Sequence, residues 1–260
     1  MCGIVGYIGD KGASPLLLEG LKRLEYRGYD SAGVAVMNGN GVETRKAAGK
    51  ISKLEAVLSA NPLSGNVGIA HTRWATHGAP NECNAHPHVS MDGTVAVVHN
   101  GIIENFSLLR SKLQALGYKF VSETDTEVLA HLIQEAYEDS LEQAVMDALS
   151  QVEGTYGIAV VSSRDPNKLV AARKGSPLLL GLGEGEYYVA SDVSAILAHT
   201  RQVVYLDDGD IAVLDRNGYR VLDNDAREMR RNVSKVDWDL GQIERGGYAH
   251  FMLKEIFEQP

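Results

Sequence analysis

Residues 1–9 read MCGIVGYIG, and this short stretch carries both a predicted strand and a candidate nucleophile. Gly3 to Ile8 is a run of small and apolar residues, which is typical of a buried strand. Removal of Met1 would leave a thiol and a free α-amine on Cys2. A thiol with a pKa of about 8.5 and an α-amine with a pKa of about 7.7 to 8.0 can exchange a proton near neutral pH. A cysteine that merely follows the start codon is the alternative, and position alone leaves both readings open.

The first half of the chain alternates strand-like and helix-like stretches. Asn38-Gly39-Asn40-Gly41 lies between two apolar runs and is a strong signal for a hairpin turn. Leu16, Leu17, Leu21 and Leu24 fall on one face of a predicted helix. Strands are predicted over 34–37, 42–46, 67–71 and 94–99, and helices over 15–25, 51–59, 104–116 and 127–138.

The second half is predicted to be mainly strands, over 156–161, 169–173, 178–182, 187–190, 203–206 and 211–214. So many strands require two sheets. With helices in the first half and after Asp192, the expected fold class is α+β, with two packed sheets between helical layers. Polarity rises from about residue 225, so the domain is expected to span 1–225. Residues 226–260 are then a tail or linker whose last segment, HFMLKEIFEQP, is predicted to be helical.

Composition narrows the possible partners. The chain has 260 residues, 44% of them hydrophobic, and a formal net charge of -9, which disfavours nucleic acid and anionic membrane surfaces. No apolar run approaches the ~18 residues that span a bilayer, and no signal peptide is evident, so a cytoplasmic location is expected. Only Cys2 and Cys83 are present, too few for a disulfide scaffold. Cys83 is interpreted as an inert thiol.

Six motifs occur in one order along essentially the whole chain. MCGIVGYIG is followed by LEYRGYDSAG at 24–33, HTRWATHG at 71–78, NAHPH at 84–88, HNGIIEN at 99–105 and SETDTE at 122–127. Together they resemble the class II glutamine amidotransferases, and LEYRGYDSAG and HTRWATHG are similar to the glucosamine-6-phosphate synthases among them. Phosphoribosylpyrophosphate amidotransferases and asparagine synthetases share the Cys-Gly-Ile start and rank second and third.

The resemblance implies an N-terminal nucleophile hydrolase fold, a four-layer αββα sandwich. It also implies that Cys2 attacks the side-chain amide of L-glutamine, forms a thioester and releases ammonia. The oxyanion would be stabilised by the side-chain amide of Asn100 and the backbone N–H of Gly101. Taken without the resemblance, Asn100-Gly101 is a dipeptide that often makes a tight turn at the end of a strand.

The resemblance also assigns residues to the two charged groups of an amino-acid substrate. Arg73 would bind the α-carboxylate and Asp125 the α-ammonium, since a guanidinium fork suits a carboxylate. On sequence alone, Asp125 is expected to cap a helix, because Thr124-x-x-Glu127 has the capping-box pattern. Thr76 and His77 resemble residues that contact glutamine. Trp74 resembles a mobile lid that controls the passage of ammonia, with an ordinary half-buried aromatic as the alternative.

Two further patterns are given structural interpretations. Five of the eight histidines lie between His71 and His99, but they form no recognisable metal-ligand motif, so no metal and no cofactor are expected. Gly181 to Gly185 lacks the spacing and the following helix of a phosphate-binding loop. A hairpin turn is expected there instead.

The resemblance extends to what lies beyond this chain. The full enzymes join this glutaminase domain to two sugar-phosphate isomerase-type domains. They convert fructose 6-phosphate to glucosamine 6-phosphate with channelled ammonia, and they are expected to be homodimers. Residues 226–260 would be the linker toward that second half. The competing hypothesis is a silent domain that binds glutamine and signals to a partner, but the presence of Cys2, Arg73, Asn100 and Asp125 favours the enzyme.

Overall fold

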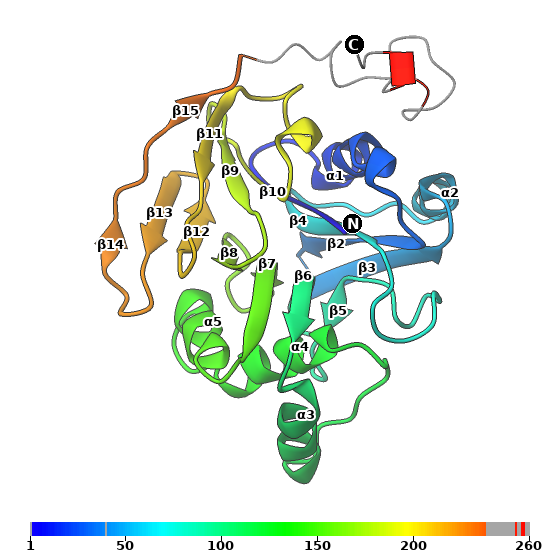
Figure 1. The fold of residues 1–260 in the computed structure, drawn as a ribbon, viewed down its shortest axis with the longest axis vertical. Coiled ribbons are helices and arrows are strands. Elements are labelled where there is room, and N and C mark those ends of the chain that lie inside the picture. The colour runs from blue at the N-terminus through cyan, green and yellow to red at the C-terminus, as the bar shows by residue number, and fades with distance from the viewer. Residues whose placement is uncertain (1, 40, 238–252, 254–255, 258–260) are drawn as a thin grey trace.

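The computed structural model describes residues 2–39, 41–237, 253 and 256–257, and every structural statement below concerns these residues. Their strands form two antiparallel sheets, with helices on the outer face of each (Figure 1). The first sheet has the strand order β15-β11-β9-β10-β1-β4-β2-β3. Its strands are β1 (Gly3–Ile8), β2 (Ser31–Asn38), β3 (Gly41–Ala48), β4 (Val67–Arg73), β9 (Leu179–Leu182), β10 (Tyr187–Ala190), β11 (Gln202–Tyr205) and β15 (Ser234–Lys235).

The second sheet has the strand order β14-β13-β12-β8-β7-β6-β5. Its members are β5 (His88–Val89), β6 (Val95–Ile103), β7 (Gly154–Ser162), β8 (Leu169–Lys174), β12 (Ile211–Asp215), β13 (Gly218–Leu222) and β14 (Glu228–Met229). The helices are α1 (Ala13–Arg23), α2 (Ile51–Ala60), α3 (Phe106–Ala115), α4 (Thr126–Glu135) and α5 (Leu141–Leu149), with 3₁₀ turns at η1 (Glu25–Arg27) and η2 (Val193–Ala195).

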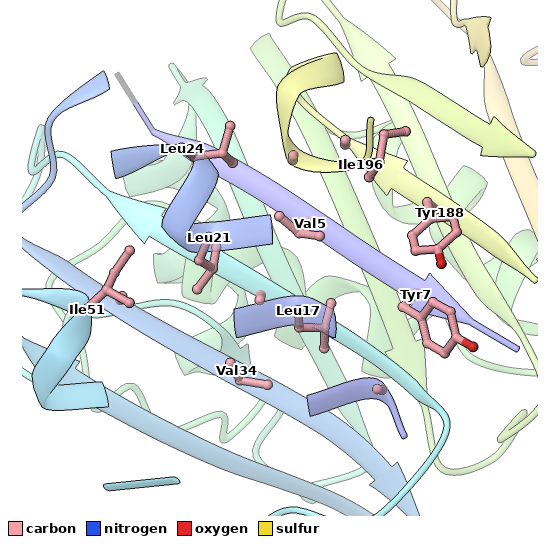
Figure 2. Packing of buried hydrophobic residues seen from close by; sticks show 14 of the residues in the cluster. Val5, Tyr7, Leu17, Leu21, Leu24, Val34, Ile51, Tyr188 and Ile196 are labelled. Atoms are coloured by element: carbon pink, nitrogen blue, oxygen red, sulfur yellow. The ribbon is translucent and has the colours of Figure 1, made fainter. Parts of the chain in front are cut away.

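Three apolar cores separate the four layers. The first lies between α1, α2 and the first sheet, the second between the two sheets, and the third between the second sheet and α3 to α5. Figure 2 shows the first of these, where Leu17, Leu21 and Leu24 meet Val5 and Tyr7 of β1. Fully burying each such side chain contributes about 1.5 to 3 kcal/mol. The spacing of these leucines by three and four residues is therefore what docks α1 on the sheet.

The predicted αββα architecture is correct. The hairpin is also confirmed, since β2 and β3 pair with Asn38 opposite Gly41. The turn expected at Gly181 to Gly185 joins β9 to β10, and the N–H of Gly183 donates to the carbonyl of Glu186 at 2.9 Å. Most predicted elements begin or end within a few residues of the observed ones.

Helix α5 and strands β5, β13, β14 and β15 were not predicted from the sequence, and less helix follows Asp192 than the sequence predicted. Asp192 accepts a hydrogen bond from the N–H of Ser194 at 2.9 Å, which caps a single 3₁₀ turn that does not extend into an α-helix. Helix α5 is only nine residues long and is capped by Ser140, whose hydroxyl accepts from the N–H of Gln143. Short elements of this kind leave too little periodic pattern to identify.

Beyond residue 225 the chain continues to add to the fold. β14 pairs with β13 at the edge of the second sheet, and β15 pairs with β11 at the edge of the first. Arg231 also binds the buried carboxylate of Asp210. The domain boundary near 225 stays a prediction, and the predicted helix over 250–260 lies almost entirely outside the described residues. None of the described helices has the length and apolar character needed to cross a bilayer.

Candidate active site

A cavity of about 520 Å³ lies where β1, β4 and β6 meet the loops that follow β4 and precede α4. It contains every site residue that the sequence predicted. The lining includes Cys2, Arg73, Trp74, Thr76, His77, Asn100, Gly101 and Asp125. These side chains come from four separate motifs, and the two packed sheets bring them together.

The register of the first sheet positions Cys2. Gly3 pairs with Thr72 of β4, so the preceding residue lies beside the backbone at the end of β4. The sulfur of Cys2 accepts a hydrogen bond from the N–H of Trp74 at 3.2 Å and lies 3.5 Å from the carbonyl oxygen of Trp74. Burial raises the pKa of the Cys2 thiol, while the N–H of Trp74 acts in the opposite direction. The resting group is therefore a neutral thiol that needs a base to become a nucleophile.

Asn100 and Gly101 lie inside β6, so the tight-turn interpretation of this dipeptide is wrong. β6 continues to Ile103, paired throughout with β7. The amide of Asn100 has its Oδ1 at 2.9 Å from Nε2 of His71, and its Nδ2 donates to the carbonyl of Cys2 at 3.3 Å. Gly101 has φ of 135°, and a Cβ there would lie 2.1 Å from the carbonyl oxygen of Thr155. Only glycine fits this position.

The guanidinium of Arg73 is buried at the end of β4, with 3% of the residue exposed. Its Nη2 donates to the carbonyls of His77 and Gly78, and its Nη1 donates to that of Ala79 at 3.3 Å. These contacts use three of the five N–H donors of the group, which leaves two for a ligand. Arg73 thus also pins the loop that carries the neighbouring cavity residues.

The capping box predicted at Thr124 to Glu127 does not form. Asp125 occupies the N-cap position of α4, but its side chain makes no capping bond, and its Oδ2 accepts from the N–H of Ile103 at 2.9 Å. The carboxylate of Glu127 instead accepts from the N–H groups of Val121 and Ser122 at 2.8 and 2.7 Å. Because the side chain of Asp125 makes no capping hydrogen bond, its buried carboxylate lines the cavity.

Glu127 holds the 121–125 segment as an ionised group. Burial acts to raise its pKa, but hydrogen bonds from His131, Ser122 and Val121 outweigh it and lower the pKa of Glu127 to about 2. A carboxylate that accepts several N–H and O–H bonds is stabilised in its charged form. This segment therefore keeps its shape throughout the neutral range.

The loop after β4 carries the remaining predicted residues. Trp74 is 55% exposed, and its ring lies so close to Gly28 that a Cβ there would be 2.5 Å from it. Thr76 and His77 lie side by side, with Oγ1 and Nδ1 3.3 Å apart. The backbone of the loop is tied to Asp30, whose carboxylate accepts from the N–H of Ala75 and whose own N–H donates to the carbonyl of Arg73 at 2.7 Å.

Four buried histidines line and support the cavity. The ring of His71 stacks on that of His86 with centroids 4.2 Å apart, and His86 meets His88 edge-on at 4.8 Å. Burial lowers the pKa of His71 and of His88 to about 3, holds that of His86 well below its usual value, and also lowers that of His99. All four rings are therefore neutral at pH 7. Within the described residues, no group of three or more histidine, cysteine or acidic side chains is arranged to hold a metal ion.

Other residues of the cavity were not predicted from the sequence. Some lie inside the quoted motifs, which could have flagged them, whereas those from the second half of the chain carry no chemical signal. The additional lining residues are Arg27, His86, His99, Ile102, Thr124, Thr126, Thr155, Ser176, Pro177 and Ser191.

Comparison with known proteins agrees with this fold. Residues 58–238 match the family described as the glutamine amidotransferase domain, and the chain belongs to that family. The fold is also similar to a solved glutamine phosphoribosylpyrophosphate amidotransferase from B. subtilis, with a TM-score of 0.75 and 26% identity. That match covers 88% of this chain and 50% of the other.

Among curated proteins, the chain is similar to several named glutamine--fructose-6-phosphate aminotransferase (isomerizing). Identity is 54% over 260 residues with the protein from Clostridium tetani, 55% over 267 residues with that from Chlorobaculum tepidum, and 53% over 260 residues with one from Thermus thermophilus. Each match covers 100% of this chain and 43% of the relative. The chain therefore spans less than half the length of these relatives.

Proposed function

We propose that this chain hydrolyses L-glutamine to glutamate and ammonia, with Cys2 as the nucleophile after removal of Met1. The observation that carries the proposal is the single cavity in which the Cys2 thiol, the Asn100 amide, a buried arginine and a buried aspartate converge. An amino-acid amide needs these four groups. The thiol attacks, the amide receives the oxyanion, and the two charged residues hold the α-groups.

Substrate binding is assigned to both ends of the amino acid. The two remaining donors of Arg73 hold the α-carboxylate, and the unbonded oxygen of Asp125 holds the α-ammonium. Thr76 and His77 contact the bound glutamine from the loop above. Trp74 is the mobile cover of the cavity, consistent with an indole that is more than half exposed.

The reaction proceeds by acyl transfer. The α-amine of Cys2 takes the proton of the thiol, and the sulfur bonds to the side-chain carbonyl carbon of glutamine. The Nδ2 of Asn100 and the N–H of Gly101 donate to the oxyanion. The resulting ammonium returns the proton to the leaving nitrogen, so ammonia departs and a thioester remains. Water then adds to the thioester, and its breakdown regenerates the thiol and releases glutamate.

In the longer protein, the ammonia would be used elsewhere. The relatives are named for amino transfer to fructose 6-phosphate, and this chain covers 43% of their length. We therefore propose that sugar-phosphate isomerase domains follow it in a homodimeric cytoplasmic enzyme that makes glucosamine 6-phosphate. The chain by itself should release ammonia without making amino sugar.

The test pairs the intact mass of the purified 260-residue chain with glutamate release from glutamine. Loss of one methionine together with activity, and no activity in Cys2→Ala, is the expected result. A Cys2→Ala variant with the full rate would refute the nucleophile assignment. Activity with Met1 still attached would exclude the α-amine as the base. Cys83→Ala is the matched control, since that exposed thiol lies outside the cavity.

A further inference from the structure

The side-chain amide of Asn100 can serve an oxyanion in only one of its two orientations. Its NH₂ group must face the reacting carbonyl beside Cys2, because its own oxygen would repel the developing negative charge. A half-turn of the amide exchanges oxygen for nitrogen with almost no change in shape. Packing therefore cannot select the productive orientation, and a specific hydrogen-bond partner has to do so.

We infer that His71 is a positioning residue that fixes the productive orientation of the Asn100 amide. The inference rests on the function proposed above. Nε2 of His71 lies 2.9 Å from Oδ1 of Asn100, whereas the contact between Nδ2 of Asn100 and the carbonyl of Cys2 is longer, at 3.3 Å. The shorter bond holds the oxygen end on the side away from the reacting atoms. The nitrogen end is then directed toward Cys2.

The proton of the His71 ring decides which end of the amide it binds. Nδ1 is buried and makes no hydrogen bond to any described residue. A proton on Nδ1 would find no acceptor in hydrogen-bonding geometry among the described residues, and Nε2 would become an acceptor that attracts the NH₂ group of Asn100. A proton on Nε2 is instead donated to Oδ1. The neutral ring with its proton on Nε2 is therefore the form that prepares the site.

The surroundings of His71 keep the ring in place and neutral. The residue is fully buried on β4, and its ring lies within 18° of parallel to that of His86. Nδ1 of His86 accepts from the N–H of His99 at 3.3 Å, which anchors the second ring to β6. Burial holds the pKa of His71 at about 3. The imidazole thus bridges the two sheets as a fixed donor and takes no part in proton transfer.

The test compares two substitutions of His71 in the 260-residue chain. His71→Leu removes the donor at similar volume, and we expect kcat for glutamine hydrolysis to fall roughly 10²-fold with KM within about twofold, as for loss of one oxyanion donor. His71→Gln can still offer an N–H to Oδ1 and should recover at least about tenfold of that loss. His199→Leu, a partly buried histidine outside the cavity, is the matched control and should leave kcat unchanged.

A double-mutant cycle with Asn100→Ala separates positioning from a general structural role. If His71 acts through Asn100, the double variant His71→Leu/Asn100→Ala should be no slower than Asn100→Ala alone. Multiplying losses would overturn the inference, as would an unchanged kcat in His71→Leu. Failure of the proposed function looks different, because then Cys2→Ala or Asn100→Ala would itself keep the full rate.

One measurement needs no variant and decides the matter even if His71→Leu fails to fold. Long-range ¹H–¹⁵N correlation spectra of the intact chain report which ring nitrogen carries the proton. We expect His71 to be neutral with its proton on Nε2 at pH 7. A proton on Nδ1 would overturn the inference.

Discussion

The two halves of the candidate active site are held in different ways. Cys2, Asn100 and Gly101 lie in or next to strands, where backbone register sets their places, as in the pairing of Asn100 with Gly157. Trp74, Thr76 and His77 follow the end of β4 on a loop that has no such pairing. The groups proposed for bond making thus lie on the first of these, the strand-held half. Groups proposed to contact the substrate lie on the second, the loop half, which can adjust more easily.

The loop half depends on side chains that bond to its backbone. Arg73 binds three of its carbonyls, and Asp30 binds the N–H of Ala75. From the other side, Asn84 donates to the carbonyl of Ala79 at 3.0 Å and accepts from the N–H of Glu123 at 2.9 Å. Asn84 therefore links this loop to the segment before α4. Losing one such bond should loosen substrate binding, whereas disturbing the strands should abolish the chemistry.

A pair of glycine substitutions should show this contrast most strongly. Gly101→Ala places a Cβ 2.1 Å from a backbone carbonyl of β7, so the sheet must open; we expect a loss of at least ~3 kcal/mol of stability and no measurable hydrolysis. Gly78→Ala also has positive φ, but its Cβ would meet the side-chain amide of Asn84 and not a backbone carbonyl. We expect the free energy of unfolding to fall by about 1 kcal/mol and KM for glutamine to rise. Denaturant unfolding and hydrolysis kinetics measure the two variants. If both substitutions lowered the free energy of unfolding and the hydrolysis rate equally, the contrast would be contradicted.

Acid should weaken the strand-held half through its buried histidines. Burial, followed by the charge of Lys46, lowers the pKa of His88 to about 3, and Glu127 only partly opposes this. Below its ordinary pKa of about 6.5, the ring binds a proton in the unfolded chain but not in the folded one, so stability falls as pH falls toward 3. This one ring should cost about 1.7 kcal/mol of stability between pH 6.5 and 5.

Unfolding by urea at pH 6.5 and 5.0 measures this loss. His88→Gln should remove the contribution of one ring from the pH dependence, while its amide can still bond to Thr124, which lies 3.0 Å from Nε2 of the native ring. The carboxylate of Glu127 also loses its contribution in acid, but only as pH falls from about 4.5 through 2, below the range tested. A pH dependence unchanged by His88→Gln would show that the ring is not held neutral.

For the strand-held half of the site, the sequence selected residues that the structure gathers around one cavity, but it did not predict their backbone setting. The Asn100-Gly101 pair was equally compatible with a turn, because its local preference says nothing about pairing with β7. The partner of Asn100 could not be predicted at all. His71 and Asn100 are far apart in the sequence, and only the packing of β4 against β6 brings them together.

Local patterns were also overridden near Asp125. The capping box at Thr124 to Glu127 is a valid pattern, but Glu127 finds better donors in the segment before it. Because tertiary bonds outcompete a cap worth about 1 kcal/mol, sequence rules fail at such sites. The fold was easier to predict, since β1 is a continuous apolar run and α1 carries a clear helical periodicity of apolar residues.

A smaller effect is expected from loss of the single hydrogen bond between Asp30 and the loop that follows β4. Asp30→Ala removes the acceptor for the N–H of Ala75, so the loop should sample more conformations before binding. We expect KM for glutamine to rise about tenfold, which corresponds to about 1.4 kcal/mol, with kcat reduced less than about threefold. Asp30→Asn keeps one acceptor oxygen, so its KM for glutamine should lie between those of the native chain and Asp30→Ala. A fall in kcat at constant KM would place Asp30 with the strand-held half instead.

The smallest effect should come from Trp74, an exposed side chain of the site. Trp74 touches the Cys2 sulfur through its backbone, not its indole, so Trp74→Ala should keep the N–H that lowers the thiol pKa and change stability by no more than about 0.5 kcal/mol. The pH dependence of Cys2 alkylation, measured in a Cys83→Ala background, should then stay unchanged. Trp74→Pro lacks that N–H and should move the alkylation midpoint upward. If Trp74→Ala moves the alkylation midpoint as much as Trp74→Pro does, the indole and not the backbone N–H controls the pKa of the Cys2 thiol. Trp74 would then belong with the strand-held half of the site and not with the loop half.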